Sequence, residues 1–205
     1  MHRGHIEIAR YVNNTLNLNH VRFVLSARPP HRSSPIASIE HRSQMLRAAI
    51  QNESGFCEDE RECQRPGPSY MVWTLRALRA EKPKNSLALI IGADAFVMLD
   101  TWFHWEQILT LTHLIVLPRS GWSVSELAHT WYRGPMSVDP SELHRSTAGQ
   151  VLFCDAPRVD VSASAIREKI AAGQDVASDI PDVVWIYIRE HGLYGYSTRS
   201  KKHAI

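Results

Sequence analysis

The sequence has few cysteines and no long apolar run, and both absences exclude classes of protein. Cys57, Cys63 and Cys154 cannot form a closed set of disulfides, and their spacing fits no zinc pattern. A chain without a disulfide framework is typical of a reducing compartment, so we expect a cytoplasmic protein. No apolar run approaches the length of a membrane-spanning helix, and the N-terminus lacks the apolar core of a signal peptide. We therefore expect no membrane partner.

The chain also lacks an excess of charge of either sign. It has 23 lysines and arginines against 21 aspartates and glutamates, a net charge of +2, which is too balanced to indicate binding to nucleic acid. Its 205 residues, 44% of them hydrophobic, are enough for one domain with a real core. We expect a single domain over residues 1–196 and a disordered basic tail over 197–205. The oligomeric state stays open, and an oligomer is possible.

Strand-like and helix-like patterns alternate along the chain. Short runs rich in apolar and β-branched residues predict strands at 21–25, 87–91, 114–117 and 151–154. Apolar residues at helical spacing, together with capping signals, predict helices at 6–16, 38–50, 70–79, 162–172 and 182–191. This alternation indicates a doubly wound α/β fold with a mostly parallel sheet. The run at 87–91 is apolar throughout, so we expect a central strand covered on both faces.

Two histidines flank a glycine where the first helix should begin. They are His2 and His5, with Gly4 between them. A helix N-terminus presents unpaired N–H groups and the positive end of its dipole, so it suits a phosphate. The glycine leaves room for a phosphate near the backbone, and the imidazoles can donate hydrogen bonds to it. The alternative interpretation is a frayed, solvated terminus.

A second helix start far along the chain combines two hydroxyls with an arginine. Ser162 and Ser164 precede Arg167 in the segment 161–170. An arginine can bind a phosphate through two parallel hydrogen bonds. For the serines, ordinary helix capping is the alternative interpretation.

Together the two helix starts resemble the nucleotidyltransferase family that carries the motifs H-x-G-H and I-S-x-[ST]-x-I-R. Further segments occur in the order seen in nicotinate-nucleotide adenylyltransferases: Pro29-Pro30-His31-Arg32, Pro68-Ser69-Tyr70, Ile90-Ile91-Gly92-Ala93-Asp94, Thr101-Trp102, His113-Leu114-Ile115-Val116 and Gly192-Leu193-Tyr194. The resemblance covers roughly residues 1–194. It implies a Rossmann-like sheet with helices on both faces.

The resemblance also implies an activity: transfer of the adenylyl group of ATP to nicotinate mononucleotide, giving deamido-NAD and pyrophosphate in NAD biosynthesis. The attacking phosphate is largely ionised at neutral pH, because the second pKa of a phosphomonoester is about 6. No general base is then required. The site must position the reactants and neutralise the growing negative charge. Mg²⁺ is expected with the ATP, and no residue is expected to be a resident metal ligand.

The resemblance assigns roles to individual residues. His2, His5 and Arg167 would be catalytic and contact the phosphates of ATP. The residues implied to bind ATP are Gly4, Gly92, Asp94, Ser162 and Ser164, with Asp94 on a ribose hydroxyl. Capping of the next helix is the alternative for Asp94. The residues implied to bind the mononucleotide are His31, Arg32, Tyr70, Trp102, Phe103 and Arg119, with Trp102 stacked on the pyridine ring. For Trp105, a core role is the preferred interpretation.

The chain departs from the family pattern at two places. The family's first strand and its G-G-[ST]-F-D-P loop should precede His2, so we expect a sheet without its first strand and question the activity of the chain from Met1. Met71 stands where the family commonly has threonine, so the preference for nicotinate over nicotinamide stays open. Two alternatives remain. One is a truncated, catalytically impaired relative that binds nucleotide or a partner protein. The other is a different small adenylyltransferase, such as pantetheine-phosphate adenylyltransferase.

Overall fold

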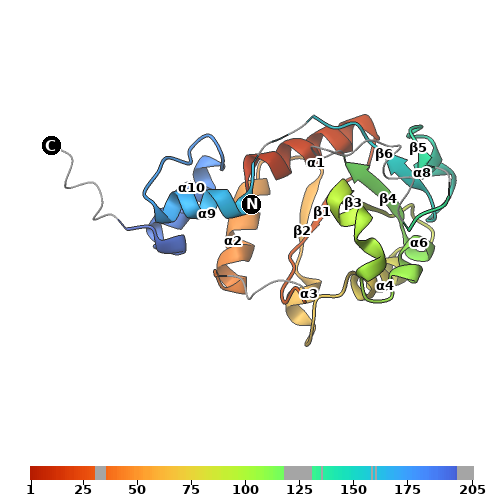
Figure 1. Ribbon diagram of the computed structural model, residues 1–205, viewed down its shortest axis with the longest axis horizontal. Coiled ribbons are helices and arrows are strands. Elements are labelled where there is room, and N and C mark those ends of the chain that lie inside the picture. The colour runs from red at the N-terminus through yellow and green to blue at the C-terminus, as the bar shows by residue number, and fades with distance from the viewer. Residues whose placement is uncertain (31–35, 118–130, 135, 158, 160, 198–205) are drawn as a thin grey trace. The chain divides into compact units, whose positions relative to one another are not determined.

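The computed structural model describes residues 1–30, 36–117, 131–134, 136–157, 159 and 161–197. The chain forms two compact units, whose helices and strands are labelled in Figure 1. Unit 1 comprises Met1–Asn13, Leu18–Pro66 and Val159–Ile205, and unit 2 comprises Asn14–Asn17 and Gly67–Arg158. The expectation of one domain over residues 1–196 stays a prediction.

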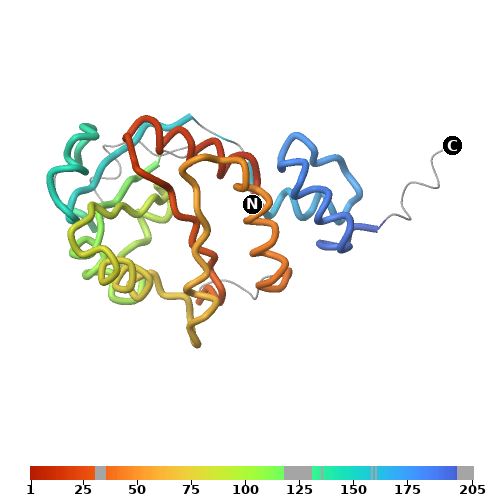
Figure 2. Tube along the Cα trace, turned by 180° about the vertical axis from the view of Figure 1, so that it is seen from behind, coloured from red at the N-terminus to blue at the C-terminus, as the bar shows by residue number. Residues whose placement is uncertain are grey.

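Unit 1 pairs a two-stranded sheet with helices from both ends of the chain. Its strands β1 (Val21–Val24) and β2 (Phe56–Asp59) are parallel and run beside each other in both views (Figure 2). Its helical elements are α1 (Arg3–Thr15), α2 (Ile39–Ile50), α3 (Arg61–Gln64), α9 (Ala163–Ala171), α10 (Asp182–Glu190) and the 3₁₀ turn η3 (Leu193–Gly195). Buried apolar residues of α1, α2, α9 and α10 form one core cluster. The C-terminal helices are therefore packed with the first helix.

Unit 2 is built on a four-stranded parallel sheet in the order β3-β4-β6-β5. The strands are β3 (Ala88–Gly92), β4 (His113–Leu117), β5 (Met136–Ser137) and β6 (Val151–Phe153). The helical elements are α4 (Met71–Glu81), α5 (Ala93–Val97), η1 (Leu99–Thr101), η2 (Trp105–Gln107), α6 (Ile108–Leu111) and α8 (Glu142–Arg145). Every residue of β4 is buried, and strands lie on both sides of it. Within the described residues, no helix is long and apolar enough to cross a membrane.

Every described strand pair is parallel, which confirms the predicted parallel α/β arrangement. Two details differ from the expectation. The described strands form two sheets and not one, and the run at 87–91 is not a central strand, because β3 lies at the edge of its sheet and is mostly half-buried. The interior strands of this sheet are β4 and β6. An apolar run shows that a strand is largely covered, but it does not show which strands lie beside it.

Arg79, in the last turn of α4, joins several loops of unit 2. Its Nη2 donates to the carbonyl oxygens of Leu111 (2.7 Å) and Thr147 (2.6 Å), and its Nη1 donates to that of Asn85 (2.7 Å). Nε donates to the Leu111 oxygen as well, at 3.1 Å. A guanidinium has five N–H donors in a fixed plane, so one side chain can satisfy carbonyls that arrive from separate segments.

His113, the first residue of β4, is a fully buried histidine in a defined tautomer. Its Nδ1 accepts from the Gln150 N–H at 3.0 Å, so the neutral ring carries its hydrogen on Nε2 and donates to the Ser146 carbonyl at 3.0 Å. Burial lowers the pKa of His113, and the nearby positive charge of Arg79 adds to this effect, while the bond to Ser146 opposes it. His113 is thus a structural histidine that folding keeps neutral.

Asp59, the last residue of β2, is a buried carboxylate between two arginines. Its Oδ2 lies 2.6 Å from Nη2 of Arg61 and 3.0 Å from Nη1 of Arg22. Burial alone would raise the pKa of Asp59, but the hydrogen bonds from Arg61 and Arg22 outweigh it and lower the pKa. Unit 1 therefore keeps this buried group charged, whereas unit 2 keeps His113 neutral.

Candidate functional site

The predicted phosphate-binding residues of unit 1 lie at the N-termini of α1 and α9. Ile6, in the first turns of α1, shares one core cluster with Ile166 of α9. The Met1 amino group is buried, and this burial, followed by the positive charge of Arg167, lowers its pKa. Arg167 therefore lies close to the start of α1. We call the set His2, Gly4, His5, Ser162, Ser164 and Arg167 the phosphate cluster.

A second contact fixes the start of α1 within unit 1. The Arg3 backbone N–H donates to the Asp179 carbonyl at 2.9 Å, and the Arg3 side chain forms an ion pair with Asp182 at 2.9 Å. Both partners lie at or just before the start of α10. The first N–H groups of a helix have no partner within it, so the bond to Asp179 satisfies one of them and leaves the helix end rigidly placed.

The two histidines of the phosphate cluster stack on each other. Their ring centroids are 3.7 Å apart with an angle of 32° between the planes. His2 is buried, with 8% of its surface exposed, whereas His5 is exposed. His2 thus supports the ring of His5 from the protein side, and His5 presents its imidazole to solvent or to a ligand.

The serines of the phosphate cluster differ in their contacts. Ser162 occupies the N-cap position of α9, but its side chain makes no capping hydrogen bond and is exposed. The capping interpretation is therefore wrong for Ser162. The Ser164 hydroxyl accepts a hydrogen bond from Nη2 of Arg167 at 3.0 Å. One hydroxyl is thus open to a ligand, and the other orients the arginine.

Two residues that no site prediction included lie close to the phosphate cluster. Burial raises the pKa of Tyr194, while the positive charges of Arg167 and Arg42 oppose that rise, so the phenol lies near two guanidinium groups. Arg42 donates to the carbonyl oxygens of Ser26 (2.5 Å) and Ala27 (3.1 Å). The sequence marked Tyr194 only as part of a motif, and no sequence signal distinguished Arg42 from other surface arginines.

In unit 2, four rings form an aromatic cluster: Tyr70, Trp73, Phe103 and His104. Tyr70 and Phe103 are stacked with centroids 4.4 Å apart, and Trp73 contacts both edge-on at 5.1 and 5.7 Å. His104 packs against Phe103 at 4.1 Å. Trp73 and His104 were not predicted. Trp73 follows Tyr70 by three residues at a helix start, and this spacing places side chains together.

Trp102 does not join the aromatic cluster. The structure brings its indole into no ring contact with Tyr70 or Phe103, and the half-buried side chain packs against the core of unit 2. Trp105 also packs there, with its ring 5.1 Å from that of Trp131. The core interpretation of Trp105 is thus confirmed, whereas the stacking role of Trp102 stays a prediction.

The segment from Gly92 to Asp94 lies where a nucleotide site is expected. Gly92 ends β3 and is the N-cap residue of α5, and Asp94 lies in the first turn of that helix with its side chain exposed. Ligands of open α/β sheets bind at the carboxyl ends of the strands. The N-cap position belongs to Gly92, so Asp94 is not the cap of α5. A ribose contact stays a prediction.

Three of the predicted substrate-binding residues, His31, Arg32 and Arg119, lie outside the described residues. Among the residues that are described, no group of three or more histidine, cysteine, aspartate or glutamate side chains could hold a metal ion.

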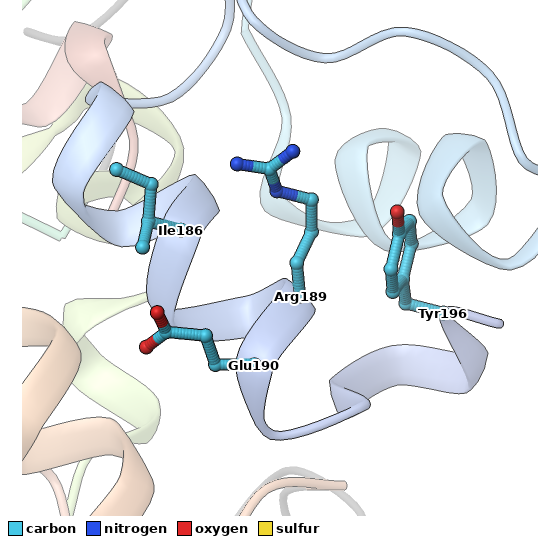
Figure 3. Close-up of a pocket in the computed structure, with 4 residues that line it drawn as sticks. All are labelled: Ile186, Arg189, Glu190 and Tyr196. Atoms are coloured by element: carbon cyan, nitrogen blue, oxygen red, sulfur yellow. The ribbon is translucent and has the colours of Figure 1, made fainter. Parts of the chain in front are cut away.

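A surface cavity of 230 Å³ in unit 1 is separate from the predicted site residues. It is lined by Ile186, Arg189, Glu190 and Tyr196 (Figure 3). The Arg189 guanidinium lies 5.5 Å from the ring centroid of Trp185, which Tyr196 contacts edge-on. Its lining includes no residue of the phosphate cluster, so this cavity is not the predicted phosphate site.

Comparisons with known proteins place the chain in a family. The cytidylyltransferase-like family model matches residues 1–169, so the chain belongs to the cytidylyltransferase-like family of nucleotidyltransferases. Within it, the chain is a member of the nicotinate-nucleotide adenylyltransferase family. It is 39% identical over 197 residues to a probable nicotinate-nucleotide adenylyltransferase of Acidithiobacillus ferrooxidans, covering 95% of this chain and 90% of that protein. It is 41% identical over 201 residues to one of Marinobacter nauticus, covering 95% and 92%.

A solved structure supports the fold independently. Plasmodium falciparum nicotinic acid mononucleotide adenylyltransferase, complexed with NaAD, matches with a TM-score of 0.73 at 15% identity, covering 96% of this chain and 93% of that one. This likeness confirms the predicted Rossmann-like α/β fold.

Proposed function

We propose that this chain transfers the adenylyl group of ATP to nicotinate mononucleotide, forming deamido-NAD and pyrophosphate in the cytoplasmic synthesis of NAD. The observation that carries the proposal is the phosphate cluster: the N-terminal parts of α1 and α9 share one core cluster, and Arg167 of α9 lies near the Met1 amino group that precedes His2 and His5. The curated relatives at 39% and 41% identity support the choice of reaction and acceptor.

The phosphate cluster suits a reaction without a general base. The acceptor phosphate attacks the α-phosphorus of ATP, and the bond to the departing pyrophosphate breaks. His5 is exposed and supported by His2, so its ring can donate to a phosphate oxygen as charge develops. Arg167, oriented by Ser164, can hold the departing pyrophosphate. The helix N-termini add backbone N–H donors and positive dipole ends.

The aromatic cluster suits the pyridine ring of the acceptor. Tyr70 and Phe103 offer ring faces and edges within unit 2, and Trp102 follows from the family pattern. Met71 is the first residue of α4, and Tyr70 before it makes no side-chain capping bond. The positive end of the α4 dipole and the N–H groups of its first turn can bind the nicotinate carboxylate. A threonine hydroxyl is then not required at residue 71, and the positive helix end favours the anionic nicotinate over the neutral nicotinamide.

Magnesium enters this proposal as part of the substrate. Because the described residues contain no metal-binding cluster, we propose that Mg²⁺ arrives on the triphosphate and neutralises part of its charge when bound. His5 and Arg167 would contact phosphate oxygens of the same triphosphate.

The test is an acceptor panel. Purified protein with MgATP is given nicotinate mononucleotide, nicotinamide mononucleotide or phosphopantetheine, and the dinucleotide product is separated and quantified. We expect deamido-NAD as the main product. Turnover with phosphopantetheine alone would overturn the acceptor assignment. ATP binding by calorimetry without turnover on any acceptor would favour the impaired, nucleotide-binding relative.

A further inference from the structure

Gly4, in the first turn of α1, is covered by the side chain of Val159. A Cβ placed on Gly4 would lie 2.6 Å from Cγ1 of Val159 and 3.2 Å from Nδ1 of His2. Both distances are shorter than ordinary contacts between such atoms, so the methyl group of Val159 occupies the space that any side chain at residue 4 would need. Valine branches at Cβ and has little rotamer freedom, so it cannot easily turn aside.

This contact joins the two halves of the phosphate cluster. Val159 belongs to the segment that leads into α9, the helix of Arg167, and Gly4 belongs to the turn of α1 that places His2 and His5. The same space at Gly4 is bordered by the ring of His2, on which His5 is stacked. A shift of Val159 would therefore move the start of α1, and with it His5, relative to the N-terminus of α9.

We propose that Val159 is a positioning residue for adenylyl transfer: packed on Gly4, it sets the placement of His5 relative to Arg167. The inference rests on the function proposed above and deepens it. It also gives Gly4 a second reason to be glycine. Gly4 leaves room for Val159, whereas the sequence alone suggested that Gly4 leaves room for a phosphate.

The two reasons for Gly4 predict different behaviour of a double variant. If the space at Gly4 belongs to Val159, then removing the valine methyl groups makes room for an alanine at residue 4. If the space belongs to a phosphate, an alanine there obstructs the phosphate whatever stands at residue 159. A misplacement of about 1 Å can cost on the order of 100-fold in rate, so the difference is measurable.

The experiment compares Gly4→Ala, Val159→Ala and the double variant with the unchanged protein. We expect Gly4→Ala to lower kcat by about 10- to 100-fold while the KM for nicotinate mononucleotide stays within about twofold. Val159→Ala should lower kcat only about threefold, because a looser contact still allows the productive placement. The double variant should return to the kcat of Val159→Ala alone. The matched control combines Gly4→Ala with Val161→Ala. Val161 packs against the same core, and none of the three atoms nearest to a Cβ at Gly4 belongs to it, so this control should show no recovery.

A double variant as slow as Gly4→Ala, or a Gly4→Ala protein with unchanged kcat, would overturn the role of Val159. Recovery by Val161→Ala would overturn it too, since the effect would then be general loosening of the core. If the unchanged protein shows no adenylyl transfer, the proposed function is wrong, and ATP affinity of the same proteins then carries the test. Weaker ATP binding in Gly4→Ala that recovers only with Val159→Ala would support the contact, and equal affinities in all of them would contradict it.

Discussion

The phosphate cluster and the aromatic cluster are built in different ways. The phosphate cluster lies on the ends of α1 and α9, which are fixed by core packing, by the ion pair of Arg3 with Asp182 and by backbone hydrogen bonds. The aromatic cluster combines the start of α4 with a segment between short 3₁₀ turns, where His104 has a left-handed φ of 52° and Phe103 is 40% exposed. The proposed phosphate-binding residues thus lie on regular helix ends, and the proposed ring-binding residues lie on an irregular segment held by ring contacts.

The largest expected effect breaks the phosphate cluster. His5→Ala should lower turnover by about 100-fold or more, as expected for losing one donor that stabilises developing charge. The KM for nicotinate mononucleotide should change little, because the lost contact is to ATP. Steady-state kinetics measures both. His20→Ala, at another exposed histidine of unit 1, is the matched control and should keep normal turnover. A His5→Ala protein with more than half of normal turnover would remove His5 from the mechanism.

A smaller effect is expected from the ring-binding side. Trp102→Ala should raise the KM for nicotinate mononucleotide by roughly tens-fold and leave the KM for ATP nearly unchanged, because base–aromatic stacking contributes about 1–3 kcal/mol. Trp105→Ala is the comparison, since Trp105 packs on Trp131: it should lower the thermal midpoint without changing either KM. If both KM values rise together in Trp102→Ala, then Trp102 acts only as core, as its packing in unit 2 allows.

A moderate effect is expected from the hydrogen bond between Ser164 and Arg167, which tests how the phosphate cluster orients its arginine. Ser164→Ala should lower kcat/KM for ATP by about two- to tenfold, because a typical hydrogen bond contributes about 0.5–1.5 kcal/mol. Ser164→Thr keeps the hydroxyl and should stay close to the original value. Loss of activity in both variants would show that residue 164 acts through its size and not through its bond to Arg167.

The smallest expected effect is a difference between the two units in the pH at which each loses stability. Burial lowers the pKa of His113 below its usual 6.5, so its contribution to stability is complete above pH 6.5 and is lost as the pH falls through the folded-state pKa. Asp59 has its pKa lowered below 3.8, so its contribution persists until the pH falls below 3.8. Mild acid should therefore weaken unit 2 before unit 1. Amide hydrogen exchange between pH 7 and 4 checks this order. His113→Gln should remove the pH dependence that His113 gives unit 2, and Asp59→Asn should remove the one that Asp59 gives unit 1.

The sequence predicted local features better than contacts between distant residues. Both helix starts of the phosphate cluster, and the position of Gly92 and Asp94 after a strand, follow from short patterns that depend only on neighbours along the chain. The contact of Val159 with Gly4 joins two segments far apart in the sequence, so no periodic pattern of residues predicts it. Trp73 carries no comparable signal, since an aromatic residue at helical spacing is usually core.

The arrangement around Arg79 has a consequence for how unit 2 opens. The Arg79 guanidinium donates hydrogen bonds to the carbonyl groups of Asn85, Leu111 and Thr147, so three separate segments depend on one side chain. When the Arg79 side chain moves away, all three carbonyl groups lose this donor together. The connections around α4, α6 and the segment before β6 should therefore open as one cooperative unit on the timescale of hydrogen exchange, and not fray one at a time.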